Sequence, residues 1–415
     1  MSTLILVWSY IKFKPLNTVL NIFLLALGIA IITMLLLFSK QLEEKISTNA
    51  KGIDLVVGAK GSPLQLILCN IFHVDFPTGN IKFNEAEQLS KHRLIKSAIP
   101  IALGDSYKNF RIIGTNLSYA ELYHAEIELG NWWSKDLEVV VGATVARITK
   151  LKLGDSFASA HGLVKDARAH EDYRYIVKGI LRPANNVVDN LILTNVGSVW
   201  KVHAEGNGDV ADNDKAIKIV NPSSLISGIE EGDSIHEITA LLIKYKNPLA
   251  VIQLPRFINT QTNMQAASPA FETARLFAIL GVGFKALMGF GYVLIFISAL
   301  SIFIALYNSL KERKYDLAIM RSMGASRRKL FFTTILEGTI LTVTGSLMGL
   351  MLGHAVLFLI TILVEGSQKT GLQAWIFYPE EALLLGGSLL LGILCSLIPA
   401  FQSYRTDIHK VLAGN

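Results

Sequence analysis

Charged side chains are scarce in this sequence. Of its 415 residues, only 17% are Asp, Glu, Lys or Arg, whereas 51% are hydrophobic. Soluble domains carry about 25% charged residues, so the composition argues against a soluble protein and favours one that lies in a membrane. The formal net charge of +6 calls for no nucleic-acid partner, because cytoplasmic loops of membrane proteins are themselves enriched in Lys and Arg.

A nucleotide-binding loop is also missing. The P-loop requires G-x-x-x-x-G-K-[ST], with Lys directly after the second Gly. The nearest stretch, GAKGS at 58–62, has Lys60 before Gly61. We therefore expect a strand-to-helix turn there, with Ser62 as a helix N-cap and Pro63 in the first turn. The chain is not expected to hydrolyse ATP by this route, and we predict that it binds no cofactor of its own.

Long apolar runs, by contrast, are plentiful. A helix needs about 20 apolar residues to span a bilayer, and four runs reach that length: 16–39, 276–310, 330–363 and 382–404. The first is longer than the ~7–15 residues of a signal-peptide core and no A-x-A site follows, so we expect it to be retained. Residues 1–15 carry Leu4, Trp8 and Ile11 at helical spacing, which predicts an amphipathic helix on the cytoplasmic face, with a frayed terminus as the alternative.

Basic residues orient these spans. Residues 364–381 contain Glu365, Glu380 and Glu381 against one Lys369. Lys and Arg mark the cytoplasmic side, so the N-terminus, 311–329 and the tail 405–415 are predicted to be cytoplasmic, and 40–275 and 364–381 extracytoplasmic. The basic residues of 311–329 are Lys311, Arg313, Lys314, Arg321, Arg327, Arg328 and Lys329.

The region 40–275 alternates strand-like and helix-like runs. IDLVVG, FRIIGTN, EVVVG and YRYIVKGIL are typical of strands, while PLQLILCN, ATVARITKL and NVGSVWKVH are typical of helices. The fold class is therefore an α-helical membrane protein with four transmembrane helices and a large α+β extracytoplasmic domain between the first and second. Residues 116–230 are expected to form a strand-rich subdomain inserted between 50–115 and 231–275.

Cysteine is nearly absent. Cys69 lies in the extracytoplasmic domain and Cys395 in the fourth span, so the two are poorly placed to pair and the domain is expected to fold without an internal disulfide. Within the apolar run LQLILCNIF, Cys69 is interpreted as a buried packing residue rather than a reactive thiol.

Two further patterns suggest chemistry. The loop 203–214 offers His203, Asp209, Asp212 and Asp214 as weak candidate metal ligands; it does not match EF-hand spacing, and a solvated loop is the favoured explanation. Inside the spans, ionisable residues usually face the bundle interior. Glu337 could do so, or could pair with the basic segment near the inner interface, and His354 is expected to reach the outer interface.

The segment 311–329, KERKYDLAIMRSMGASRRK, contains a helix-like part. Leu317, Ile319, Met320 and Met323 are expected on one side and Arg321 on another, and Gly324 suits a helix C-terminus, with Ala325-Ser326 starting the next helix. An apolar face on a basic segment predicts a partner surface. An ordinary cytoplasmic loop is the alternative.

The stretch RKYDLAIMRSMGASRRKLFFTTILEG resembles the cytoplasmic signature of the MacB/LolC/FtsX family of ABC-transporter permeases. The order of spans is similar to the family's, and LGDSF…YIVKGIL is similar to a pattern of its periplasmic core domain. The tail IPAFQSYRTDIHKVLAG is similar to the family's closing motif, except that Ile408 stands where Pro is usual. The resemblance covers most of the chain and is most specific in 311–329.

This resemblance implies a homodimeric permease in the bacterial inner membrane, with two copies of a separate cytoplasmic ABC ATPase that binds ATP and Mg²⁺. The segments 50–115 and 231–275 would form a porter-like subdomain, and 276–310 would extend as a stalk. A periplasmic adaptor or binding protein is a further candidate partner. The coupling residues that the resemblance implies are Asp316, Leu317, Ile319, Met320, Arg321, Met323, Gly324, Ala325 and Ser326.

The leading functional hypothesis is a permease subunit that uses ATP hydrolysis by its partner to export, extract or push a substrate in the periplasm. An alternative is an FtsX-like signalling protein that controls a periplasmic hydrolase. A third is a membrane-anchored enzyme or metal-binding receptor that acts alone. The sequence leaves the cargo open, and co-purification of an ATPase would separate the third hypothesis from the first two.

Overall fold

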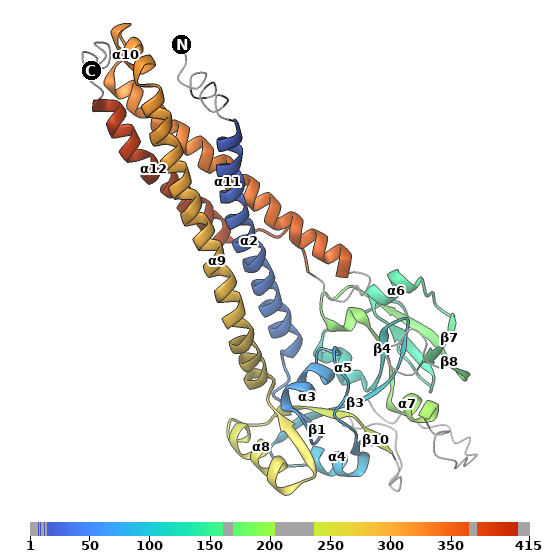
Figure 1. Ribbon diagram of the computed structural model, residues 1–415. Coiled ribbons are helices and arrows are strands. Elements are labelled where there is room, and N and C mark those ends of the chain that lie inside the picture. The colour runs from blue at the N-terminus through green and yellow to red at the C-terminus, as the bar shows by residue number, and fades with distance from the viewer. Residues whose placement is uncertain are drawn as a thin grey trace. The chain divides into compact units, whose positions relative to one another are not determined.

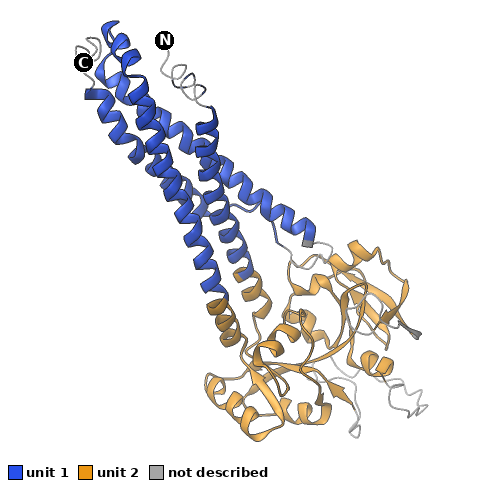
Figure 2. Cartoon of the chain, viewed as in Figure 1, with its two compact units in different colours: residues 1–42, 280–415 blue, residues 43–279 orange. Residues whose placement is uncertain are grey.

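The computed structural model of the chain describes Val7, Ser9 and Lys12 and residues 15–160, 169–203, 236–364 and 372–405. Two compact units are present: residues 1–42 with 280–415, and residues 43–279 (Figure 2). Most of the predicted N-terminal helix 1–15 and the tail beyond Arg405 lie outside the described residues.

Four helices in the described part of the chain are long and apolar enough to cross a membrane: α2 (Pro15–Ala50), α9 (Pro269–Glu312), α11 (Arg327–Val364) and α12 (Pro379–Arg405). The four predicted spans lie inside these helices, each of which continues beyond the apolar run. The helix α2, for example, runs on through QLEEKISTNA. In the helical unit, the start of α2 and the end of α12 lie at the same end as the short helix α10 (Lys314–Ser322) (Figure 1).

Glycines let α2 approach two neighbouring helices closely. On α11, Gly345, Gly349 and Gly353 recur every four residues against α2. A Cβ atom added at Gly349 would lie 2.7 Å from the carbonyl oxygen of Ala26. On another side of α2, a Cβ at Gly28 would lie 2.9 Å from Ile295 of α9. Small residues of this kind allow helix backbones to pack tightly inside a bilayer.

Hydroxyl and amide side chains add hydrogen bonds between these helices. The Ser301 hydroxyl of α9 donates to Asn21 Oδ1 of α2 at 2.5 Å, and Ser298 donates to the Asn21 carbonyl at 3.3 Å. The hydroxyls of Ser346 on α11 and Ser388 on α12 lie 2.7 Å apart. Asn21, Ser298, Ser346 and Ser388 are all buried, so these bonds satisfy polar groups that lipid could not.

The other unit is built on a sheet of ten described strands, in the order β12-β1-β11-β3-β4-β9-β6-β8-β5, with β7 paired to β3 and β8. Neighbours are antiparallel except β4 with β9 and β6 with β8. A separate pair joins β10 to β2. The strands are β1 (Leu55–Ala59), β2 (Ile81–Lys82), β3 (Ile95–Tyr107), β4 (Phe110–Thr115), β5 (Ile127–Gly130), β6 (Glu138–Val141), β7 (Ser156–Ala160), β8 (Ala169–Leu181), β9 (Leu191–Asn195), β10 (Glu237–Ile238), β11 (Ala240–Tyr245) and β12 (Met264–Ala267).

Short helices connect these strands, and most of the predicted elements are confirmed. The Ser62 hydroxyl accepts a hydrogen bond from the Gln65 amide, so GAKGS forms the predicted turn into a capped helix. Cys69 is buried in that helix, and burial raises the pKa of its thiol to about 11 despite the opposing charge of Arg111. The helices are α3 (Pro63–Asn70), α4 (Phe83–Ser90), α5 (Leu117–Leu122), α6 (Ala143–Thr149), the 3₁₀ helix η1 (Val187–Asn190), α7 (Val196–His203) and α8 (Ala250–Gln261).

The sheet continues across residue 116, where an inserted subdomain was expected to begin. The reason is the length of β3, which pairs with β11 through Ile95–Ile101 and with β4 through Ala102–Tyr107. Strand β4 then pairs with β9. The strands of 116–203 therefore extend the same sheet as those of 50–115.

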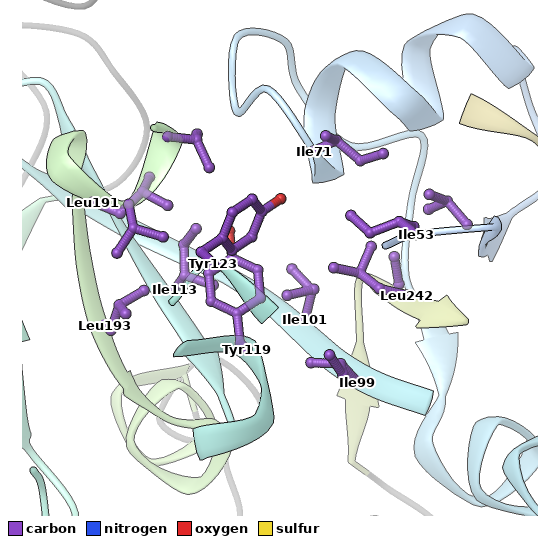
Figure 3. Close-up of a cluster of buried hydrophobic side chains, with 14 of the residues drawn as sticks. Ile53, Ile71, Ile99, Ile101, Ile113, Tyr119, Tyr123, Leu191, Leu193 and Leu242 are labelled. Carbon is purple, nitrogen blue, oxygen red and sulfur yellow. The ribbon is translucent and has the colours of Figure 1, made fainter. Parts of the chain in front are cut away.

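Both faces of this sheet are buried. Val56 packs in one hydrophobic cluster, whereas its neighbours Leu55 and Val57 pack in another, as the two-residue period of a strand requires. The first cluster contains the ring pair Tyr119 and Tyr123, with centroids 5.0 Å apart, among aliphatic side chains from several strands (Figure 3). The Tyr123 hydroxyl donates to the Asn49 carbonyl at the end of α2. The unit thus has hydrophobic packing of its own on both faces of the sheet.

Replacing Gly349 by Leu should disrupt the packing of α2 on α11, because the new side chain would overlap the backbone at Ala26. Overpacking of this kind costs about 1–3 kcal/mol. We expect thermal unfolding of the detergent-purified chain to begin at lower temperature than in the wild type. Gly386→Leu on α12 is the matched control, since nothing lies within 4 Å of its added Cβ. Equal melting temperatures for the two variants would contradict the packing described.

Candidate coupling segment

The helix α10 links α9 to α11 and has well-defined ends. At its C-terminus Gly324 adopts a left-handed φ of +98°, a conformation that favours glycine. The Ala325 amide donates to the Met320 carbonyl at 2.9 Å, and the Gly324 amide to the Arg321 carbonyl at 3.0 Å. The next helix, α11, begins at Arg327, and the hydroxyl of the preceding Ser326 accepts a hydrogen bond from the Lys329 amide at 3.3 Å. The predicted helix stop and restart are both confirmed.

The apolar residues of α10 divide between two faces. Leu317 and Ala318 are buried, whereas Ile319 is 37% exposed and Met323 is 82% exposed. Sequence spacing placed Leu317, Met320 and Met323 on a single side; Leu317 and Met320 do share a side, and the assignment is wrong for Met323. Residues 313, 317 and 320 follow each other at helical spacing and line a small cavity beside α9 and α11. The outward face consists of Tyr315, Ile319 and Met323, flanked by Asp316 and the partly exposed Arg321.

A buried ion pair joins the start of α10 to α11. Arg313 Nη1 lies 3.7 Å from Glu337 Oε1, and their side chains are 10% and 11% exposed. The surrounding residues are Leu310, Leu317, Met320, Leu330, Thr333 and Thr334. Glu337 therefore combines the two sequence interpretations, since it is buried and also pairs with the basic segment. Its partner Arg313 was not among the predicted site residues, although its spacing from Leu317 and Met320 indicates the inward face.

Two family models match the chain. The MacB-like periplasmic core domain matches residues 18–229, and the FtsX-like permease C-terminal domain matches residues 288–408. The first match alone spans more than half of the 415 residues. The chain belongs to the MacB/FtsX-like family of ABC transporter permeases. It is a membrane protein with four spanning helices and an extracytoplasmic α+β domain, and α10 falls within the FtsX-like match.

One relative of this MacB/FtsX-like permease is an uncharacterized ABC transporter permease of Methanocaldococcus jannaschii. It is 22% identical over 265 residues, which cover 62% of this chain and 61% of the relative. The alignment therefore spans less than two thirds of the relative's length.

Solved structures similar to the permease include the periplasmic region of MacB from Actinobacillus actinomycetemcomitans, at 14% identity and a TM-score of 0.33. That match covers 56% of this chain and 97% of that structure. Another is the extracellular domain of the noncanonic ABC-type transporter YknZ from Gram-positive bacteria, at 10% identity and a TM-score of 0.30. It covers 52% of this chain and 99% of that domain.

Of the four candidate metal ligands of the permease, His203 lies within the described residues. His203 ends α7, and its Nε2 lies 3.6 Å from Oδ1 of the buried Asp105. Asp209, Asp212 and Asp214 lie outside the described residues. Within the described ranges, no group of three or more His, Cys, Asp or Glu side chains is placed to hold a metal ion.

The side chain of His354 is buried in the helical unit: it is 1% exposed and contacts Glu381 at the start of α12. Sequence reasoning missed this pairing because the two residues belong to different helices. The signal available was indirect: Glu381 is the acidic residue that closes the loop following the span of His354.

Removing one member of the Arg313–Glu337 pair should destabilise the helical unit more than removing both. Loss of one partner from a buried pair costs about 3–5 kcal/mol, because the other charge is left without compensation. We expect Glu337→Gln to lower the melting temperature of the purified permease by several degrees, and Arg313→Gln combined with Glu337→Gln to recover most of it.

Glu380→Gln is the control for this cycle, because the Lys40–Glu380 pair is exposed and should contribute little. Additive losses in the Arg313/Glu337 double variant would mean that the two side chains do not interact.

Proposed function

We propose that this permease couples ATP hydrolysis by a separate cytoplasmic ABC ATPase to conformational work on an extracytoplasmic substrate. The observation that carries the proposal is the outward face of α10. Tyr315, Ile319 and Met323 are exposed on a helix that α9 and α11 hold from the other side. Apolar side chains on a solvent-exposed face of a short helix contribute nothing to its stability, whereas a groove of another protein can bury them.

The basic charges support both the orientation and the partner. Arg327, Arg328 and Lys329 follow α10 and are exposed, and an excess of Lys and Arg marks the cytoplasmic side of a membrane protein. The N-terminus, α10 and the C-terminal tail would then face the cytoplasm, where ATP is available. Because the chain has no P-loop, hydrolysis is assigned to the partner.

The buried Arg313–Glu337 pair offers a route from this surface into the membrane. A push on α10 from outside the chain would act on α11 through the ion pair and through Leu317, which is buried beside it. Packed helices transmit such displacements because their contacts deform little. In this proposal a homodimer of the permease binds two copies of the ATPase in the inner membrane, and a periplasmic adaptor or binding protein delivers or receives the substrate.

Charge placed on the outward face should prevent the ATPase from binding. Met323→Glu would put a carboxylate where the partner buries an apolar side chain, which is costly without a compensating group. Arg321→Glu would reverse a charge at the edge of the same face. We expect each variant to retain about tenfold less ABC ATPase on affinity purification than the wild type.

The control is Leu129→Glu, an equally polar change at an exposed position of the extracytoplasmic sheet, which should retain the ATPase. The membrane fraction should contain equal amounts of all four proteins. Undiminished ATPase in the Met323→Glu preparation would refute the coupling role of α10, and absence of ATPase from the wild-type preparation would refute the proposed function itself.

A further inference from the structure

A second buried polar site lies at the opposite end of α11 from Glu337. His354 is 1% exposed and Glu381 is 3% exposed. His354 Nε2 lies 3.0 Å from Glu381 Oε2, and His354 Nδ1 lies 2.5 Å from the carbonyl oxygen of Ala374. The other carboxylate oxygen, Glu381 Oε1, accepts a hydrogen bond from the Tyr378 amide at 3.1 Å.

The partners of the imidazole fix the number of protons at this site. The Ala374 carbonyl can only accept, so Nδ1 must carry a proton. Nε2 faces a carboxylate oxygen, so one more proton must lie between them, either on Nε2 as an imidazolium or on Glu381 as a carboxylic acid. In both cases the pair is neutral overall and holds one proton beyond that on Nδ1. Without this shared proton, the imidazole has one N–H but faces two acceptors, the Ala374 carbonyl and the Glu381 carboxylate. One of these two contacts then becomes repulsive.

Aromatic rings lie against the imidazole. The ring of His354 stacks on Trp375, with centroids 5.9 Å apart and planes at 6°, and lies 4.6 Å from the ring of Phe377. Aromatic faces attract a cation. In the described part of the chain, the neighbouring charged groups are Lys40 of α2 and Glu380 of α12, which pair with each other at 2.8 Å. Tyr378 supplies the titratable phenol of the same loop.

The loop 372–378 contacts three helices, α2, α11 and α12. This loop is held to α2 by two hydrogen bonds: the Gln373 amide donates to Gln41 Oε1 at 2.7 Å, and Gln41 Nε2 donates to the Gln373 carbonyl at 2.9 Å. Ala374 packs with Leu37 of α2 and Leu357 of α11. The imidazole of α11 and the carboxylate of α12 hold the same loop from the other side.

We propose that His354 and Glu381 form a binding site for one proton, and that its occupancy keeps the loop 372–378 fastened to α2, α11 and α12. When the proton leaves, the contact to Ala374 or the contact to Glu381 is lost, and the loop detaches. The site does not depend on the ATPase, so its test is separate from that of the proposed function.

Amide hydrogen exchange of the full-length chain in lipid nanodiscs tests this directly. Protection factors for the 372–378 segment, corrected for the intrinsic effect of pH, should fall by about tenfold or more as the pH is raised, with the steepness of a single proton. The decisive variant is Glu381→Gln. Its amide can donate permanently to an unprotonated Nε2 while its oxygen still accepts from Tyr378, so the loop should stay protected at every pH.

Two further variants complete the design. Glu381→Ala should leave the loop unprotected at every pH, and Glu380→Gln should keep the wild-type profile, since it removes only the neighbouring exposed pair. The melting temperature of each variant shows that the helices remain folded. A wild-type profile that is flat over the pH range in which the chain stays folded would overturn the proposal. So would a Glu381→Gln profile that falls as the wild type's does.

Discussion

Close backbone packing of α2 against two other helices is the constraint on which the helical unit depends. Inside a bilayer no hydrophobic effect draws helices together, so the contacts must come from shape and hydrogen bonds. Gly345, Gly349 and Gly353 of α11 provide that shape on one side of α2, and Gly28 and Gly291 provide it towards α9. Because α9 and α11 both pack on α2, their linked ends are fixed in space, and α10 spans the distance between them.

The helix α11 carries an ionisable side chain near each end, and each is paired with a residue from a different element. Glu337 meets Arg313 at the start of α10, and His354 meets Glu381 at the start of α12. The two sites lie about 25 Å apart along the helix. Ionisable groups inside membrane proteins are expensive and usually functional. A displacement of α11 along its axis would affect both pairs, which makes this helix the natural connection between the two ends of the unit.

The sequence predicted those features of the structure that depend on a single segment of the chain. Apolar length located the four spans, glycine chemistry located the end of α10 at Gly324, and Ser62 marked the start of α3, because each of these depends on nearby residues alone. It was less informative where partners come from distant segments. The inward position of Leu317, the burial of His354 and the pairing of Arg313 with Glu337 all depend on how separate helices meet. The role of the long β3 in joining the two halves of the sheet was not predicted for the same reason, because its partner strand β11 is distant in the sequence.

In the proposed coupling, energy from ATP enters this chain through the outward face of α10. The most direct measurement is photo-crosslinking in intact cells, with a benzophenone amino acid at position 323 and, for comparison, at position 129 of the extracytoplasmic sheet. Coupling through α10 predicts that position 323 cross-links to a protein with a P-loop and that position 129 does not. A crosslink from position 323 to no such protein, with efficient labelling of the chain, would contradict it.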